Sequence, residues 1–313
     1  MTEVPITVLM PAYNAAQYIA EAIQSVLEQT FTNFELLIVN DGSTDHTSNV
    51  LASFTDPRIR VINQVNGGVS VALNAGLREA RGTYIARFDA DDVCYPYRLE
   101  QQYLFMQANP DYVVIGSDAD YMSEEGEFLF TYNNTGYSNE EIKSRINDYC
   151  PFVHSSVFYA RKSVLDVGGY EPRAHSFEDY FLWVKLIKYG KVCNFRQPLI
   201  KVRFNPSSVT VDEKDRTPRF NELKKKAMQN GHISEEEGIE LLINTRKLNP
   251  DKKLGSYHRM IAKKYLWNNY QPAKARRHLL SSLKHEPLKR TSYLLYFFSF
   301  LPQRLIRKIY NMK

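Results

Sequence analysis

Strand-like and helix-like segments alternate four times within the first 90 residues of this 313-residue chain. Apolar runs typical of buried strands occupy residues 6–10, 34–39, 59–62 and 84–88. In the intervening segments, such as residues 15–29, apolar side chains recur every three to four positions, which indicates helices. This alternation predicts a parallel, doubly wound α/β sheet. Ligands of such sheets bind at the carboxyl ends of the strands.

Acidic residues directly follow the fourth strand-like run. Asp89 and Asp91 stand two residues apart, so they project to the same side of an extended backbone. Paired oxygen ligands at a strand end suit Mg²⁺ or Mn²⁺, and such a cation suits a diphosphate. A solvated acidic turn is the alternative interpretation of the same residues.

Asp41 ends the second strand-like run and is followed by Gly42. A carboxylate in this place can accept a hydrogen bond from an N–H group of a pyrimidine base, and Gly42 permits a tight turn beside it. The alternative is turn chemistry, because Asp-Gly-Ser-Thr commonly links a strand to a helix that Ser43 or Thr44 caps. Both interpretations can hold for different residues of this link.

Glu178 and Asp179 stand at the start of a helix expected over residues 176–189. The spacing of Ser176 and Asp179 fits a capping box, which is a structural role. The functional alternative is a general base, since a carboxylate in the first helical turn stays ionised beside the helix dipole. Such a base could take the proton of an acceptor hydroxyl as that oxygen attacks a sugar carbon.

The rest of the chain is expected to contain both strands and helices up to residue 215 and helices beyond it. Further strands are expected at residues 112–117, 152–159 and 199–204, with a hairpin within residues 118–137 that turns at Glu125 and Gly126. Helices are expected at residues 96–109, 139–148 and 161–167. These patterns predict one domain over residues 1–215 and a helical C-terminal region over residues 216–313.

The basic charge of the chain is concentrated in its last 30 residues. The net charge is +5, while residues 284–313 alone carry +6, so the remainder sums to −1. A nucleic-acid-binding core would spread its positive charge over a face, so we expect no nucleic-acid partner. Arg304, Arg307 and Lys308 alternate with apolar residues, a pattern that suits an anionic membrane surface. A helix packed on the chain's own core is the alternative.

Cysteine content and hydropathy indicate a cytoplasmic protein. The three cysteines, Cys94, Cys150 and Cys193, are far apart and lack metal-ligand spacing, which favours a reducing compartment. Residues 1–5 lead at once into a strand-like run without a basic and apolar leader. No run reaches the roughly 20 apolar residues that span a bilayer. Residues 265–283 resemble one degenerate tetratricopeptide-like helix pair.

Six short motifs, taken together and in order, resemble family-2 glycosyltransferases with the GT-A fold. The match covers residues 5 to 210, while G-x-G-x-x-G, Walker A, H-E-x-x-H and G-x-S-x-G motifs are absent. The motifs are Pro11-Ala12-Tyr13-Asn14; Asn40-Asp41-Gly42-Ser43-Thr44-Asp45; Asn66-Gly67-Gly68-Val69-Ser70 with Asn74-Ala75-Gly76; Asp89-Ala90-Asp91-Asp92; Gly168-Gly169-Tyr170; and Glu178-Asp179. The resemblance implies an α/β fold, a Rossmann-like nucleotide-diphospho-sugar transferase domain of GT-A type with a C-terminal helical extension.

The resemblance also implies roles for individual residues. Residues expected to contact the nucleotide are Pro11, Ala12, Tyr13, Asp41, Asn66 and Asp89. Asp91 would ligate Mn²⁺ or Mg²⁺, and Asp89 would lie between the ribose and the metal. Asp179 would be the catalytic base, with Glu178 beside it on the acceptor or donor side.

Two positions depart from the family pattern, and one histidine has two interpretations. Leu73 precedes Asn74 where members often have arginine. Asn205, in Arg203-Phe204-Asn205-Pro206, stands where many members have a histidine near the diphosphate; an asparagine can still offer an oxygen ligand or donate to a phosphate. His154 resembles an acceptor-side residue, and a structural histidine is the alternative.

These observations predict an inverting, metal-dependent glycosyltransferase. It would move a sugar from a nucleotide-sugar, a UDP-sugar by resemblance, to a hydroxyl of a saccharide or lipid-linked saccharide in bacterial surface polysaccharide synthesis. It would act in the cytoplasm, at the inner face of the cell membrane. One alternative is a sugar-nucleotide nucleotidyltransferase, although the glycine-rich loop with Arg and Lys after the first strand is missing. The other is a non-catalytic carbohydrate-binding protein of the membrane surface.

Overall fold

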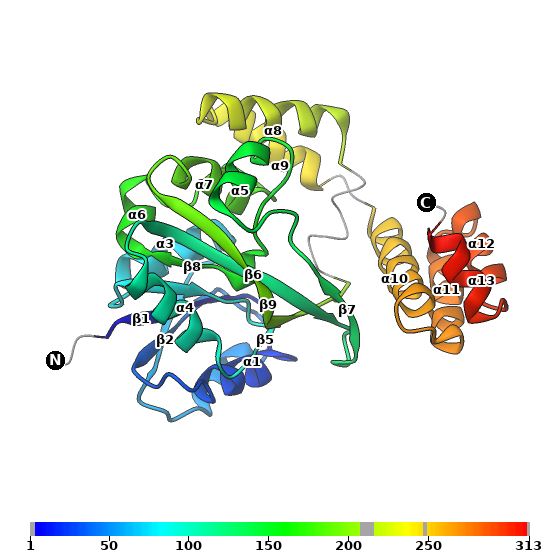
Figure 1. Ribbon diagram of the computed structural model, residues 1–313, viewed down its shortest axis with the longest axis horizontal. Helices are drawn as coiled ribbons and strands as arrows, with labels where there is room; N and C mark the ends of the chain where they lie inside the picture. The colour runs from blue at the N-terminus through cyan, green and yellow to red at the C-terminus, as the bar shows by residue number, and fades with distance from the viewer. Residues whose placement is uncertain (1–3, 207–215, 247–248, 312–313) are drawn as a thin grey trace. The chain divides into compact units, whose positions relative to one another are not determined.

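A computed structural model describes residues 4–206, 216–246 and 249–311 (Figure 1). Within these residues nine strands form one sheet in the order β3-β2-β1-β4-β8-β6-β9-β5, and β7 pairs with β6. The strands are β1 Ile6–Ala12, β2 Phe34–Asp41, β3 Ile59–Gln64, β4 Tyr84–Arg87, β5 Val93–Cys94, β6 Tyr112–Met122, β7 Phe128–Tyr132, β8 Phe158–Ala160 and β9 Lys191–Arg203.

The first four strands are parallel, as the alternating pattern predicts. β1 lies between β2 and β4, and β2 also pairs with β3. β1 and β2 are buried along almost their whole length, which explains their continuous apolar sequences. The helices that follow these strands are α1 Ile19–Leu27, α2 Thr47–Ala52, α3 Val69–Glu79 and α4 Arg98–Ala108.

Beyond the first four strands the sheet is mixed rather than parallel. β8 is antiparallel to both β4 and β6, and β5 is antiparallel to β9. β9 begins at Lys191, eight residues before the strand that the sequence predicts. The pattern missed the first half of this strand because polar residues interrupt its apolar sequence. The turn of the β6–β7 hairpin does lie at Gly126, whose φ of 84° is in the left-handed region that glycine tolerates.

The remaining helices follow the mixed part of the sheet. They are α5 Asn139–Arg145, η1 His154–Ser156, α6 Arg161–Asp166, α7 Glu178–Leu186, α8 Pro218–Asn230, α9 Glu235–Arg246, α10 Pro250–Trp267, α11 Pro272–His285, α12 Arg290–Phe298 and α13 Gln303–Asn311. In the described parts of the chain, no helix has the length and apolar content that crossing a bilayer requires.

Contacts between residues divide the chain into two compact units. The first comprises residues 1–119, 132–202 and 222–241, and the second comprises residues 120–131, 203–221 and 242–313. The predicted domain boundary at residue 215 lies outside the described residues. The second unit therefore includes the turn end of the β6–β7 hairpin, residues 120–131, as well as the last four helices.

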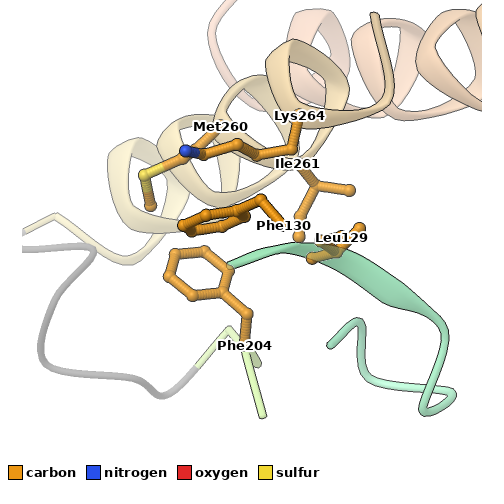
Figure 2. Close-up of a pocket in the computed structure, with 6 residues that line it drawn as sticks. All are labelled: Leu129, Phe130, Phe204, Met260, Ile261 and Lys264. Atoms are coloured by element: carbon orange, nitrogen blue, oxygen red, sulfur yellow. The ribbon is translucent and has the colours of Figure 1, made fainter. Parts of the chain in front are cut away.

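The second unit has its own apolar core. Buried side chains of α10 and α11 pack with Leu129 of β7, with Phe204 and with Leu295 and Ile306 of the last two helices. Figure 2 shows a small apolar pocket in this unit, of about 20 Å³ or the space of roughly one water molecule. The Lys264 ammonium lies 3.4 Å from the centre of the Phe130 ring at the pocket's edge, a cation–π contact. A pocket of this size has no room for a sugar nucleotide.

Candidate active site

The loops after β1 and β2 are joined by hydrogen bonds of Asn14. The Asn14 side-chain oxygen accepts from the main-chain N–H of Thr44 at 2.8 Å, and the Asn14 N–H donates to the Ser43 hydroxyl at 3.0 Å. Asn14 has a φ of 49°, a left-handed conformation that asparagine tolerates better than most residues. The predicted nucleotide contacts Pro11, Ala12 and Tyr13 lie just before it. Tyr13 is 52% exposed, whereas Ala12 is buried.

Asp41 binds the glycine-rich turn before α3. Its carboxylate accepts the main-chain N–H groups of Gly67 and Gly68 at 2.9 and 2.8 Å, and the Gln64 amide at 2.7 Å. The Asn66 side chain donates to the Asp41 carbonyl at 2.9 Å. Asp41 and Asn66, both predicted nucleotide contacts, are thus brought together. The turn role is also present, but Ser43 and Thr44 bind Asn14 rather than cap a helix.

Asp89 lies at the end of β4 and forms an ion pair with Arg87. The Arg87 side chain is 4% exposed and the Asp89 side chain 35%, so the carboxylate faces outward from a buried guanidinium. The Asp89 N–H also donates to the Ser155 hydroxyl at 3.1 Å. The neighbouring Asp91 is half-buried and Asp92 is buried. No group of three or more His, Cys, Asp or Glu side chains with metal-site geometry occurs in the described residues.

The capping box predicted at Ser176 does not form. α7 begins at Glu178 with Phe177 as its N-cap, and no side chain caps the helix. Ser176 has a φ of 67°, which turns its side chain away from the position of a helix cap. Asp179 instead accepts the N–H of the next residue, Tyr180, at 2.6 Å. The local sequence fits the capping pattern, but the left-handed backbone at Ser176 excludes it.

Glu178 and Asp179 are two adjacent carboxyls with raised pKa values. Burial, followed by the charge of Asp179, raises the pKa of Glu178 to about 7. Burial also raises the pKa of Asp179, while the Tyr180 N–H, Arg87 and Lys224 oppose this shift. The expectation that the helix dipole keeps Asp179 fully ionised therefore omitted the cost of burial. A carboxylate with a raised pKa is better suited to accept a proton.

Arg87 is a site residue that the sequence analysis missed. Its positive charge acts on Asp89 and Asp92 and on the α7 carboxyls Glu178 and Asp179. Burial would lower the pKa of the Arg87 guanidinium, but Asp89, Tyr170 and Asp92 raise it. Arg87 thus contacts Asp89 directly and also acts electrostatically on Asp92 and on the two α7 carboxyls. Asp89 is close to Arg87 in sequence, whereas only the tertiary structure shows the effect of Arg87 on α7.

Cys150 and Lys224 also approach Asp179. The Cys150 thiol donates to the Asp179 carboxylate at 3.6 Å. The Lys224 ammonium, from α8, lies 5.0 and 5.7 Å from the ring centres of Tyr180 and Phe177, which flank Asp179 in sequence. Its charge lowers the pKa of Asp179. Lys224 comes 45 residues after Asp179, so no local sequence pattern connects the two.

His154 belongs to a hydrogen-bonded group at the side of this site. Its Nε2 lies 3.0 Å from the Tyr170 hydroxyl, which lies 3.4 Å from the Tyr159 hydroxyl. Burial, and then the charge of Arg87, hold the pKa of His154 well below its usual range. The Asn74 side-chain amide donates to the Tyr170 carbonyl at 2.7 Å and accepts the Tyr170 N–H at 2.9 Å. Two of the six sequence motifs are joined by this amide.

The family model described as glycosyl transferase family 2 matches residues 7–169, which is more than half of the chain. The chain belongs to this family.

Two proteins similar in sequence to this chain are described as glycosyltransferases. An uncharacterized glycosyltransferase of Haemophilus influenzae is 31% identical over 235 residues, and the alignment covers 68% of this chain and 71% of that protein. One of Rickettsia felis is 31% identical over 206 residues, covering 66% of this chain and 34% of that protein. The chain therefore spans about a third of the length of the Rickettsia relative.

Two solved structures share the fold. S. aureus TarS 1–349 in complex with UDP-GlcNAc aligns with a TM-score of 0.56 at 16% identity, over 98% of this chain and 92% of that one. The mannosyltransferase PcManGT of Pyrobaculum calidifontis, in complex with GDP-Man and Mn²⁺, aligns with a TM-score of 0.55 at 15% identity, over 98% of this chain and 86% of that one. The family-2 chain thus has the GT-A fold.

The two departures from the family pattern have different positions. Leu73 is buried in α3, so an apolar side chain is what its surroundings accommodate. Asn205 is buried and belongs to the second unit. Its role near the diphosphate stays a prediction.

Proposed function

We propose that this family-2 chain is an inverting glycosyltransferase that uses a nucleotide-sugar donor. The observation that carries the proposal is the Glu178–Asp179 pair, which shares the buried cation Arg87 with Asp89 at the end of β4. In this proposal Asp179 is the base on the acceptor side and Asp89 the carboxylate on the diphosphate side, and both interact with Arg87. A non-catalytic sugar-binding protein would not require this arrangement.

Asp179 is the proposed base. It takes the proton of the acceptor hydroxyl while that oxygen forms a bond to the anomeric carbon of the donor sugar. The bond between the anomeric carbon and the donor phosphate oxygen breaks in the same step, and the nucleoside diphosphate leaves with the bonding electrons. Inversion follows from a single displacement. The raised pKa of Asp179, caused by burial, favours its role as proton acceptor.

Asp91 and Asp89 are the proposed ligands of Mn²⁺ or Mg²⁺. The donor set fits such an ion, because Mg²⁺ is usually held by one or two carboxylates together with substrate phosphates rather than by a cluster of protein ligands. Asp91 is half-buried, and the Asp89 side chain is 35% exposed. When bound, the ion would offset the charge that develops on the leaving diphosphate.

The proposed donor is a UDP-sugar, with Pro11, Ala12, Tyr13, Asp41 and Asn66 around the nucleotide. Support comes from the TarS complex with UDP-GlcNAc, a protein of the same fold. The proposed acceptor is a hydroxyl of a saccharide or lipid-linked saccharide in the synthesis of a surface polysaccharide. We place this activity at the cytoplasmic face of the membrane, with His154 on the acceptor side.

A panel of nucleotide sugars tested by thermal shift, with and without Mn²⁺, tests the proposal. The matching donor raises the melting temperature because it binds only the native protein, and the rise is larger with the cation. Donor hydrolysis or transfer is then measured for that sugar before and after chelation. If no nucleotide sugar shifts the melting temperature under either condition, the proposal is wrong.

A further inference from the structure

Helix α12 has apolar side chains on both its buried and its exposed faces. Leu295 points inward and is 4% exposed. On the outer side, Tyr293, Leu294 and Phe297 are 55%, 52% and 64% exposed. At 100° per residue these three lie within one arc of about 100° of the helix surface. A helix that is apolar all round is normally buried in a protein or in a lipid phase.

The neighbouring helix α13 has a cationic outer face. Arg304, Arg307 and Lys308 are all exposed and also fall within an arc of about 100°. Ile306, on the opposite side, is 1% exposed and belongs to the apolar core of the second unit. Figure 1 shows α12 and α13 beside the α10–α11 helix pair of the same unit. The apolar and basic faces are thus held by one folded core.

Charge in this region is predominantly positive. Further exposed cations lie at Arg277, Lys284, Lys289 and Arg290, and the acidic residue within residues 277–311 is Glu286. Glu286 is already paired with Arg259 at 2.6 Å. Arg290 stands one turn before Tyr293 and Leu294 and lies on the same face of α12.

We propose that α12 and α13 form a docking surface for an anionic phospholipid bilayer. Aromatic and aliphatic side chains of α12 enter the headgroup region, and the cations of α13 and Arg290 bind lipid phosphates. The surface lies outside the site that contains Asp179, so the proposal stands or falls independently of the sugar transfer. It specifies α12 as the inserting helix, whereas the sequence pattern pointed to the α13 segment.

Two other occupants fit the same residues less well. A symmetric dimer through this surface would bring the cations of two copies together, which opposes association. A nucleic acid would satisfy the cations, but it would leave Leu294 and Phe297 exposed beside a polar backbone. An anionic bilayer satisfies both the charges and the apolar side chains.

Vesicle sedimentation of the full chain tests the proposal. We expect binding to vesicles of phosphatidylcholine mixed with phosphatidylglycerol, weaker binding to phosphatidylcholine alone, and release by salt. The triple variant Arg304→Gln, Arg307→Gln, Lys308→Gln should lower the partition coefficient by about a hundredfold, because each basic residue near the surface contributes a factor of roughly five. The double variant Leu294→Ser, Phe297→Ser should lower the partition coefficient by about tenfold on both kinds of vesicle.

Matched variants of the first unit serve as controls. One control is the triple variant Lys143→Gln, Lys188→Gln, Lys225→Gln, which removes the same charge from exposed positions. The other is the double variant Leu104→Ser, Tyr189→Ser, which removes apolar side chains that are 58% and 66% exposed. These variants should bind as the wild type does. Equal loss in the controls, or no binding by the wild type, overturns the proposal. The proposal is also overturned if light scattering shows that the wild type is a dimer and that the variant Leu294→Ser, Phe297→Ser is a monomer.

Discussion

Two pairs of titratable side chains, one in each unit, show opposite responses to burial. Burial raises the pKa of both α7 carboxyls, Glu178 and Asp179. Between α10 and α11, burial lowers the pKa of His258 to about 4 and also lowers the pKa of His278, although Glu124, Glu125 and Glu127 act in the other direction on His278. In each case burial favours the uncharged form, which is the acid form of a carboxyl and the base form of an imidazole.

The difference lies in what surrounds each pair. The two histidines face one another through their Nδ1 atoms at 3.1 Å, a single hydrogen bond between neutral rings. Arg87 acts on both carboxyls and Lys224 acts on Asp179. These two cations favour the charged form of the carboxyls and so oppose the effect of burial. A neutral, satisfied pair stabilises helix packing. A pair held between its charged and uncharged forms can exchange a proton with a substrate.

The largest effect is expected for Asp179→Asn. Transfer should fall by a factor of about 10³ to 10⁴, because the amide cannot accept the proton of the acceptor. Donor affinity should persist. The melting temperature at neutral pH should not fall, since the change removes a buried charge. Transfer at the wild-type rate, or a large loss of stability, would show that the role of Asp179 is structural.

Glu178→Gln should alter the pH dependence of stability. The pKa of Glu178 is about 7 in the folded state and 4.5 without the fold, so the wild type loses stability as pH rises from 4.5 to 7. The variant should lack this decline, which is worth several degrees of melting temperature. An unchanged melting profile contradicts the coupling.

His258→Gln should have the opposite dependence. A histidine whose folded pKa is lowered loses stability as pH falls, here from 6.5 towards 4. The wild type should therefore melt a few degrees lower in acid, and the variant should lose part of that sensitivity. His46→Gln, at an exposed position of the first unit, is the matched control. Equal acid sensitivity of wild type and both variants would exclude the histidine pair as its source.

The smallest effect is expected for Lys224→Met. Without this ammonium the pKa of Asp179 rises further, so the acidic limb of the pH–rate profile should move to higher pH by less than about one unit. Lys225→Met, on the exposed side of α8, should leave the profile unchanged. A fall in rate at every pH without a shift would mean that Lys224 acts by packing rather than by charge.

Sequence alone predicted the parts of the fold that depend on local pattern. β1 to β4 are parallel strands whose apolar runs are visible without a structure, and the residues at their ends are the candidate site residues. The edge strand β5 has two residues, and the first half of β9 is interrupted by polar residues, so neither produced a signal. The antiparallel pairing of β8 also required the structure.

Sequence could name the candidate site residues but not their electrostatics. Asp41, Asp89 and Asp179 could be named because each lies next to a recognisable element. Arg87 is local to Asp89, but its effect on the α7 carboxyls and the approach of Cys150 and Lys224 to Asp179 are products of tertiary packing. Ser176 shows the reverse case, since its sequence fits a cap and its φ of 67° does not.

The excess of carboxyls around Arg87 has a kinetic consequence. Asp89, Asp92, Glu178 and Asp179 interact with Arg87, and Lys224 acts on Asp179; even with Glu178 partly protonated at neutral pH, these carboxyls outnumber the two cations before any donor arrives. A diphosphate entering alone would be repelled, whereas a divalent cation would be attracted. We therefore expect an ordered reaction in which the cation enters first and the diphosphate product leaves before it. Because such coupling is reciprocal, the donor should tighten cation binding by the same factor.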